Sequence, residues 1–321
     1  MTPDGCVVGV DVGGTSTRAL VMSLDGTVLG RGAAGGANPN SHPPPVAAGR
    51  VAEAVAAAFG SRDPGTARHC VLGLAGVSKL SDPAVGREFD SALAGIGLCC
   101  TVTSVSDAEV AYASATGEPD GSVLVAGTGS IAVRIAARRR GTVAGGHGWL
   151  LGDEGSAFWI GREAVRATLH ALRSQAGIGP LATAVLAEAL PGELDTDPGW
   201  RERYYARLIT AANAEPPIRL ARFAALVSTY ATADPAAKEI VDAAAATLID
   251  LLHAVRAPAE RTPLVLIGSV AGVGTPVGEA LRAALTAQSE GPVLDAAEAA
   301  AGAAWLAALE VLGPEAPRPM P

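Results

Sequence analysis

An acidic residue followed by a glycine-threonine turn lies near the start of the chain, between two apolar runs. Residues 6–10 are apolar, Asp11 follows, and apolar residues resume at 19–21. This order predicts a β-hairpin whose first strand ends in an acid. Asp11 is suited to hold a hydrated Mg²⁺ against a bound phosphate. The intervening residues would bind that phosphate through glycines able to adopt positive φ, exposed backbone N–H groups and hydroxyls. They are Gly13, Gly14, Thr15, Ser16 and Thr17. An ordinary Asp/Gly hairpin turn is the alternative interpretation of this motif taken alone.

Two further turns have a similar character. Residues 122–126 read as a buried strand, 131–135 as its return strand, and the turn between them contains Gly127, Thr128 and Gly129. Two such hairpins predict two phosphate-binding turns in two facing lobes. A later apolar strand, 263–267, runs into Gly268 and Ser269, where small residues could admit a flat nucleotide ring. The sequence has neither a Walker loop nor a Gly-x-Gly-x-x-Gly dinucleotide fingerprint.

Asp107 stands where a predicted strand, 100–105, gives way to a predicted helix, 108–116. A carboxylate at the carboxyl end of a strand is well placed to take the proton from a substrate hydroxyl. Capping of the helix is the alternative role. The two roles are compatible.

Five glycines accompany two adjacent acids, one His and one Trp in segment 145–155. The carboxylates of Asp153 and Glu154 can together accept hydrogen bonds from two hydroxyls of a sugar, and glycines let the backbone approach the sugar closely. The structural alternatives are that Trp149 is part of the core, Glu154 caps the following helix and His147 has a structural role. Asn38 and Asn40, in a Pro-rich loop, likewise either bind a ligand or cap a helix that begins near residue 46.

The elements that must position these residues belong to a globular chain of 321 residues, long enough for two cores. Hydrophobic residues make up 49% and charged residues 17%, so we expect disorder only in the Pro-rich tail. The net charge of −8 argues against a nucleic-acid partner. The basic run 138–140 reads as a solvated turn. Neither a signal segment nor a membrane span is evident, which predicts a cytoplasmic protein with no membrane partner.

The four cysteines read as buried thiols, because two lie in apolar strands and Cys99 and Cys100 are adjacent, a spacing poor for a disulfide. They lack zinc-site spacing, unlike the zinc loop of the repressor/kinase group of sugar kinases. Apart from the elements named above, the sequence predicts a strand at 27–31, a helix at 50–59, a strand at 67–74 and a helix at 86–96. Beyond segment 145–155 it predicts helices at 156–172, 180–190, 200–212, 218–229, 235–256 and 295–312.

The order of the three turns resembles that of the actin-like ATPase superfamily, which includes sugar kinases, actin and the large heat-shock chaperones. Segment 145–157, together with Ser106-Asp107 and the turn 127–130, resembles the N-acetylglucosamine kinase branch of the BadF/BadG/BcrA/BcrD ATPase family. The resemblance covers residue 7 to about residue 312. It implies an α/β, two-lobed, ribonuclease H-like fold in which helices flank a mixed β-sheet in each lobe and elaborate the second lobe.

The lobes expected from this resemblance are residues 1–116 with the returning helix 295–312, and residues 117–294, followed by a flexible tail at 313–321. The implied activity is ATP-dependent phosphorylation of the 6-hydroxyl of an amino sugar, N-acetylglucosamine first, with ATP and Mg²⁺ as cofactors. Asp107 would be the base. The sugar would be lined by Asn38, Asp107, Thr128, Gly146, His147, Asp153 and Glu154. His147 replaces a Trp of the vertebrate-type kinases, and Gly268-Ser269, which would hold the adenosine, replaces a more usual Gly-Gly.

Alternative functions stay open at the level of sequence. Other acceptors are glucosamine, N-acetylmannosamine, N-acetylmuramic acid and glucose. A different class is an ATPase activator of a 2-hydroxyacyl-CoA dehydratase or benzoyl-CoA reductase, which needs cysteines that hold a [4Fe–4S] cluster across a dimer. A noncatalytic actin-like scaffold would not need the segment 145–155. The helices of the second lobe predict a homodimer interface.

Overall fold

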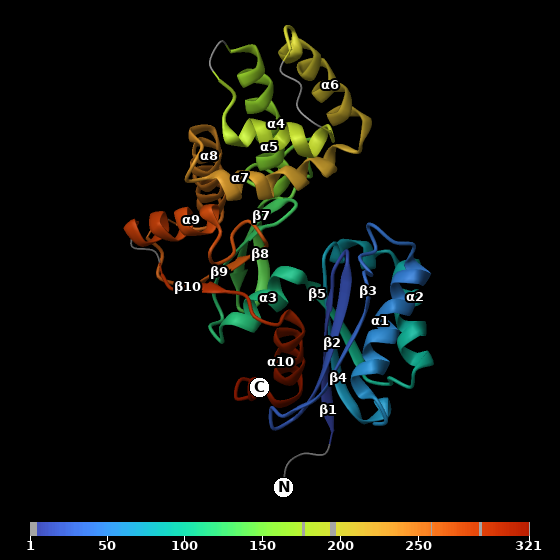
Figure 1. The fold of residues 1–321 in the computed structure, drawn as a ribbon. Helices are drawn as coiled ribbons and strands as arrows, with labels where there is room; N and C mark the ends of the chain where they lie inside the picture. Colours follow the sequence, from blue (N-terminus) through green and yellow to red (C-terminus); the bar gives the residue numbers. More distant parts are fainter. Residues whose placement is uncertain (1–4, 175–176, 193–196, 258, 289–290, 321) are drawn as a thin grey trace. The chain divides into compact units, whose positions relative to one another are not determined.

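The chain forms two compact units in the computed structural model, which describes residues 5–174, 177–192, 197–257, 259–288 and 291–320. Unit 1 comprises residues 1–120, 135–140 and 296–321, and unit 2 comprises residues 121–134 and 141–295. Each unit is associated with one five-stranded sheet (Figure 1). No helix within the described residues combines the length and the apolar character that crossing a membrane requires.

The sheet of unit 1 has the strand order β3-β2-β1-β4-β5. Its strands are β1 (Cys6–Val12), β2 (Ser16–Ser23), β3 (Val28–Gly35), β4 (Ala67–Leu74) and β5 (Thr101–Ser106). β1 pairs antiparallel with β2 and parallel with β4, and β4 pairs parallel with β5. The carboxyl ends of β1, β4 and β5 therefore meet at one edge of the sheet, because parallel strands end on the same side.

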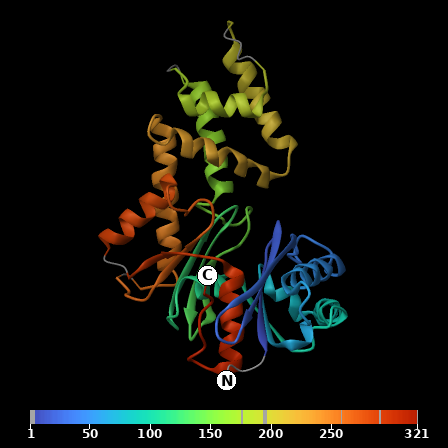
Figure 2. The same cartoon turned by 60° about the horizontal axis from the view of Figure 1, so that its bottom comes forward.

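Helices cover both faces of this sheet, as Figure 2 shows. Alternate residues of β1 pack with α1 (Pro44–Phe59) and α2 (Pro83–Gly95) on one face. The other face packs against α3 (Asp107–Ala115) and α10 (Ala299–Leu312). Gly9 allows the closest approach, since a Cβ there would lie 2.1 Å from the Ala304 backbone nitrogen of α10. Two short 3-10 helices complete the unit, η1 (Pro64–Thr66) and η2 (Val77–Ser81).

The second sheet has the order β10-β9-β6-β7-β8. Its strands are β6 (Gly121–Ala126), β7 (Ser130–Ala136), β8 (Arg139–Gly145), β9 (Leu264–Ile267) and β10 (Val293–Asp295). β9 pairs parallel with both β6 and β10. The turns after β6 and β9 therefore lie side by side at the edge of this sheet.

The helices of unit 2 share one apolar core with β6 and β7. They are α4 (Ala157–Arg173), α5 (Pro180–Ala189), α6 (Trp200–Ala214), the 3-10 helix η3 (Pro217–Phe223), α7 (Ala224–Tyr230), α8 (Pro235–His253) and α9 (Pro276–Ala287). This confirms the two mixed sheets with flanking helices that the sequence predicted. The sequence did not predict β8, α9 or β10, and the helix expected at 218–229 begins as the 3-10 helix η3.

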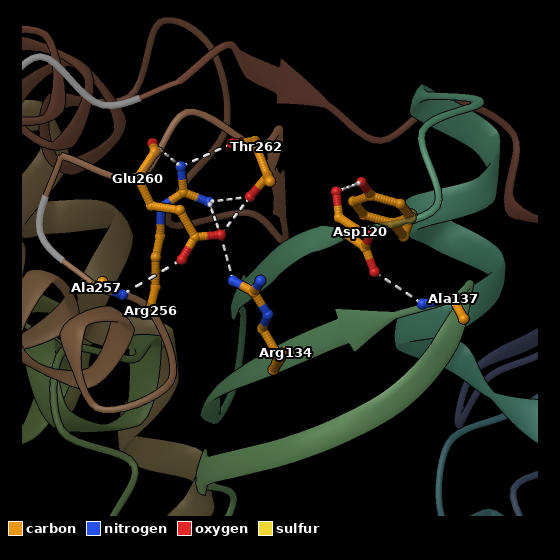
Figure 3. Close-up of polar contacts among 8 residues, drawn as sticks. Asp120, Arg134, Ala137, Arg256, Ala257, Glu260 and Thr262 are labelled. Carbon is orange, nitrogen blue, oxygen red and sulfur yellow. Dashed lines mark hydrogen bonds and ion pairs between the residues drawn. The ribbon is translucent and has the colours of Figure 1, made fainter.

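A buried charge network fixes the entry to β9 (Figure 3). The Arg256 side chain has no exposed surface and donates to the carbonyls of Glu260 and Thr262. The Glu260 carboxylate pairs with Arg134 of β7. Burial alone would raise the pKa of Glu260, but the Thr262 hydroxyl, the Arg134 contact and the charges of both arginines lower it. Glu260 therefore stays ionised and ties the loop before β9 to β7.

The C-terminus differs from the expected flexible tail. The Trp305 indole donates to the Ala316 carbonyl (3.1 Å), and Arg318 donates to the Ala113 carbonyl at the end of α3 (2.6 Å). Arg138 and Arg318 both lie over the Trp305 ring, so the prediction of a solvated turn is wrong for Arg138, which is half-buried, whereas Arg139 and Arg140 are exposed at the start of β8. Residues 313–320 are ordered within unit 1 because the Trp305 ring and the carbonyls of α3 supply their partners. The Pro-rich composition of this segment gives no sign of these contacts. Pro321 lies outside the described residues.

Candidate functional site

Asp11 lies at the carboxyl end of β1, next to the last strand residue. It pairs in register with Arg18 of β2 and Gly73 of β4, and Gly73 pairs in turn with Val105 of β5. Gly73 has no side chain on the sheet face that it shares with Asp11, and a Cβ there would lie 2.4 Å from Val110 of α3. Asp11 thus belongs to the sheet face that α3 covers.

Asp107 is the first residue of α3, and it does not cap that helix. Ser106 is the N-cap, and it forms a capping box in which the Glu109 carboxylate accepts from the Ser106 backbone N–H at 2.7 Å. The capping role considered for Asp107 is therefore wrong. Ser106 takes the cap because its side chain reaches the third helical residue, as a capping box requires. Asp107 accepts only a local hydrogen bond from Ala108 N (3.0 Å) among those described.

The charge of Asp107 acts on Asp11 within unit 1. Burial and then the neighbouring charge of Asp107 raise the pKa of Asp11 to about 6, with Arg18 partly offsetting them. Burial also raises the pKa of Asp107, although backbone N–H groups and the charge of Arg140 oppose this shift. A pair of partly buried acids is the arrangement that a divalent cation or a transferable proton stabilises.

The turn after β1 leaves room on one side. Gly13 N donates to Ser16 O (3.0 Å), and a Cβ added at Gly14 would meet no atom within 4 Å. The expectation of positive φ is wrong, since neither Gly13 nor Gly14 is among the positive-φ glycines. Here the small size of glycine matters more than its backbone freedom.

The hydroxyls of this turn divide into two groups. Thr15 is exposed and Ser16 is half-buried. Thr17 has no exposed surface, and its hydroxyl donates to Gly35 O at 2.9 Å. Thr17 therefore joins β2 to the end of β3, and we leave it out of the site proposed below.

Asn38 lies in the loop before α1 and does not cap that helix. α1 begins at Pro44, and its N-cap Pro43 has no side-chain hydrogen bond, so the capping role considered for Asn38 and Asn40 is wrong. Asn38 Oδ1 instead accepts from Asn40 N at 2.8 Å. Asn38 N donates to Gly13 O (3.1 Å), which places this loop beside the turn after β1.

The turn after β6 in unit 2 is closed by hydrogen bonds. Gly127 N donates to Gly129 O (3.0 Å), while the carbonyls of Gly127 and Thr128 accept from the first N–H groups of α4, at 2.8 and 3.3 Å. Ser156 caps α4, so the capping role considered for Glu154 is wrong. The start of α4 is therefore occupied by the turn itself, and the Thr128 side chain remains exposed.

Asp153 is buried against the same turn. It is 6% exposed, and its Oδ1 accepts from Ser130 N at 3.2 Å. A Cβ at Gly129 would lie 2.8 Å from that oxygen, so only glycine fits there unless Asp153 shifts. Asp153 also has φ of 61°, a left-handed conformation that Asp tolerates better than most residues. The structure thus joins two predicted site residues that are distant in sequence.

Residues 146–151 of the glycine-rich segment are exposed, whereas Gly152 and Gly155 are buried. Gly145, Gly146, Gly148 and Gly155 have positive φ, which is why this segment needs so many glycines. His147 and Glu154 are exposed. Trp149 is 40% exposed and contacts Phe158 edge-on, so its placement in the core is wrong.

The turn after β9 lies directly on the turn after β6. Gly268 has φ of 102°, a Cβ there would lie 2.3 Å from Ala126 O, and Val270 N donates to the same oxygen at 2.9 Å. A cavity of about 330 Å³ opens beside Ser269 and Val270. Its other walls are the starts of α4 and α9 and small residues of the η3–α7 segment, including Ala225 and Ser228.

The wall formed by α7 was missed from sequence. The run of small residues at 224–225 is its signal, but the sequence alone indicated only another amphipathic helix. Cavities of this size that are mostly apolar with a few hydroxyls are typical of small-molecule sites.

No cluster of three or more metal-ligating side chains occurs among the residues that the structure describes. Mg²⁺ usually binds through one or two carboxylates, with substrate phosphates and water completing its shell. Asp11 fits that requirement, because burial and then the neighbouring charge of Asp107 raise its pKa, and a cation would offset both effects. Asp11 could hold the ion together with a bound phosphate.

Comparison with known proteins places the chain in a family. The BadF/BadG/BcrA/BcrD ATPase family matches residues 8–307. The chain belongs to this family. A relative from Clostridium acetobutylicum, an N-acetylmuramic acid/N-acetylglucosamine kinase, is 30% identical over 166 residues, which cover 51% of this chain and 53% of the relative. The chain therefore spans about half the length of this curated relative.

Two solved structures of similar fold extend the comparison. A candidate N-acetylglucosamine kinase from Chromobacterium violaceum has a TM-score of 0.71 and 25% identity, covering 94% of this chain and 99% of its own. A ROK family glucokinase from Streptomyces griseus, solved with glucose and AMPPNP, has a TM-score of 0.55 and 18% identity, covering 94% and 99%. The fold of this BadF/BadG/BcrA/BcrD family member is thus the two-lobed, actin-like fold that the sequence predicted.

Proposed function

We propose that this protein is an ATP-dependent sugar kinase that phosphorylates the 6-hydroxyl of an amino sugar, with N-acetylglucosamine as the first candidate. The observation that carries the proposal is Asp107. It follows the carboxyl end of β5, the edge strand that pairs with β4, Ser106 rather than Asp107 caps α3, and burial raises the pKa of Asp107. A carboxyl with a raised pKa is a better proton acceptor than an ordinary surface acid.

In this proposal Asp107 accepts the proton of the 6-hydroxyl as that oxygen bonds to the γ-phosphorus of ATP. The bond from the γ-phosphorus to the bridging oxygen of ADP breaks in the same displacement, so the products are the sugar 6-phosphate, ADP and protonated Asp107. Phosphoryl transfer needs little more from a protein than such positioning and charge stabilisation. Mg²⁺ would neutralise phosphate charge when held by Asp11.

The ligands for ATP follow from the turns of the two units. Gly13, Gly14, Thr15 and Ser16 would receive phosphate oxygens in the space beside Gly14. Gly127, Thr128 and Gly129 would contact the phosphates from unit 2, with the Thr128 hydroxyl free on the surface. The cavity beside Ser269 would take the adenine ring, and Gly268 keeps that cavity next to the phosphate turn.

The sugar ligands are proposed on the basis of chemistry and of the N-acetylglucosamine kinases that the chain resembles. Asn38 offers an amide from unit 1. Gly146, His147, Asp153 and Glu154 offer backbone, imidazole and carboxylate groups from unit 2, of which Asp153 is already oriented by Ser130 N. The Clostridium relative is named for two acetamido sugars, which supports a 2-acetamido acceptor.

The ATPase-activator alternative receives no support from the cysteines. Cys6 and Cys70 are buried in β1 and β4. Cys99 is exposed and Cys100 half-buried just before β5, so the prediction of buried thiols is wrong for these two, and none of the four stands at a helix start. The homodimer and the cytoplasmic location predicted from sequence remain predictions.

Identification of the product tests the proposal. The protein, Mg-ATP and each of six sugars (N-acetylglucosamine, glucosamine, N-acetylmannosamine, N-acetylmuramic acid, glucose and galactose) are incubated, and the products are resolved by phosphorus and proton NMR. We expect a 6-phosphate of one 2-amino or 2-acetamido sugar. Formation of ADP and inorganic phosphate alone with every sugar would contradict the proposal.

A further inference from the structure

The loop that carries Asn38 and the turn that carries Gly14 are joined as one body within unit 1. The Gly13 carbonyl accepts from both Ala37 N (3.0 Å) and Asn38 N (3.1 Å). Gly36 packs so tightly that a Cβ would lie 2.0 Å from Gly14 O. A displacement of the Asn38 loop must therefore move the turn as well.

The side chains of His42 and Arg50 form hydrogen bonds that stabilise the contact between the Asn38 loop and the Gly14 turn. His42 Nε2 lies 3.2 Å from Gly14 O, and Arg50 Nη1 lies 3.3 Å from His42 Nδ1. Arg50 also donates to Gly36 O. Because a guanidinium has only donors, Nδ1 must accept, so the ring proton is on Nε2 and is donated to Gly14. Arg50 of α1 thus holds the Asn38 loop directly through Gly36 O and holds the turn at Gly14 through His42.

The far side of the loop is also fixed. Asn38 Oδ1 accepts from Asn40 N at 2.8 Å. The Asn40 side chain lies against Gly76, where a Cβ would be 1.9 Å from Asn40 Nδ2. Since β4 ends at Leu74, the loop lies between the ends of two strands of one sheet. Little freedom remains for Asn38 to move without Gly14.

We propose that His42 and Arg50 are positioning residues that couple sugar binding at Asn38 to ATP phosphate binding at the turn 13–16. This inference rests on the proposed kinase function. A sugar that shifts Asn38 towards its binding position also shifts the Gly14 carbonyl and its neighbouring N–H groups, so each ligand favours the position that the other one binds. Such coupling is reciprocal by thermodynamic necessity.

The test measures the coupling itself. Calorimetry gives the Kd of N-acetylglucosamine, or of the sugar that is phosphorylated fastest, with and without saturating Mg-AMPPNP. For the unaltered protein we expect the ratio of the two Kd values to be about 5-fold or more, in the range usual for coupled sites. In His42→Ala and Arg50→Met we expect that ratio to approach unity.

Two further variants separate positioning from general damage. His42→Gln can donate to Gly14 O and accept from Arg50, so it should restore the coupling. His69→Ala is the matched control, because His69 binds Thr103 (2.9 Å) across β4 and β5 of the same sheet. It should leave the ratio unchanged, and thermal melting of each variant confirms folding.

The outcomes are distinguishable. Full coupling in folded His42→Ala, or no coupling in a protein that binds both ligands, would overturn this inference and leave the kinase proposal standing. If the unaltered protein binds AMPPNP but no sugar of the panel, the kinase proposal fails and the inference fails with it.

Discussion

Asp11 and Asp107 of unit 1 contrast with Asp153 of unit 2 in how far the protein itself satisfies them. The first two are partly buried, and burial raises the pKa of each, so a bound cation or proton would stabilise them. Asp153 is more buried, yet its Oδ1 already binds Ser130 N. Unit 1 therefore holds two carboxyl groups whose charge the protein does not fully stabilise, whereas the turn of unit 2 is already stabilised by the Asp153 carboxylate.

The turns differ in the same way. The space beside Gly14 is empty out to 4 Å, whereas a Cβ at Gly129 would be 2.8 Å from Asp153. The turn of unit 2 also accepts two N–H groups of α4. Five substitutions and one control variant test this contrast.

The largest effect is expected for Asp107→Asn. Loss of the proton acceptor should lower kcat by about 10³-fold or more, while the Kd of the sugar changes little. Steady-state kinetics and calorimetry on the same preparation measure the two quantities. Near-normal turnover would remove Asp107 from the chemistry and, with it, the main distinction between the units.

Asp11→Asn should lower activity but raise stability. An acid whose folded pKa lies above its unfolded value destabilises the fold once it ionises, so its unfavourable contribution develops as pH rises from about 4 to about 6. Without Mg²⁺ and nucleotide, the variant should gain about 2 kcal/mol in unfolding free energy at pH 7 and nothing at pH 3.5. Urea titrations at both pH values measure this gain, and a loss of stability at pH 7 would contradict it.

Asp153 should behave in the opposite way. Asp153→Ala leaves the buried Ser130 N–H without its acceptor and places a less tolerant residue at positive φ, so it should cost about 1–2 kcal/mol of stability. Asp153→Asn keeps the acceptor and the tolerance and serves as the control. The two variants are compared by urea unfolding. Equal stability of both would show that the Ser130 contact has little weight.

The smallest effects separate the two glycines. Gly129→Ala should lower stability by about 1 kcal/mol, since its Cβ forces Asp153 to shift. Gly14→Ala meets no protein atom, so it should fold normally and raise only the KM for ATP. Thermal melts and ATP titrations distinguish the pair. A normal KM in Gly14→Ala would show that no phosphate occupies that space.

Much of the fold could be predicted because its strands are continuous apolar runs bounded by turns. β4 was predicted at its observed bounds, 67–74. β8 escaped because its sequence, Arg139 to Gly145, has few apolar residues. The docking of residues 313–320 escaped because it depends on Trp305 and on the carbonyls of α3, which are contacts that composition cannot reveal.

The candidate site shows a similar limit. A single Asp/Gly turn is commonly structural, but Asp11, Asp107 and Asp153 together indicated chemistry, because two stand at predicted strand ends and the third in a glycine-rich segment. Which serine caps α3, and where the Thr17 hydroxyl points, depend on backbone geometry one residue either way. His42 and Arg50 escaped because their partners are backbone carbonyls, which carry no sequence signal.

The measurement that tests the account most directly is ADP release from Mg-ATP, followed continuously with and without each sugar of the panel. We expect slow ADP release without sugar and strong stimulation by one 2-amino or 2-acetamido hexose, because the sugar hydroxyl next to Asp107 then accepts the phosphoryl group. Equal release with and without every sugar would contradict it and would direct attention to ATP hydrolysis coupled to a partner protein.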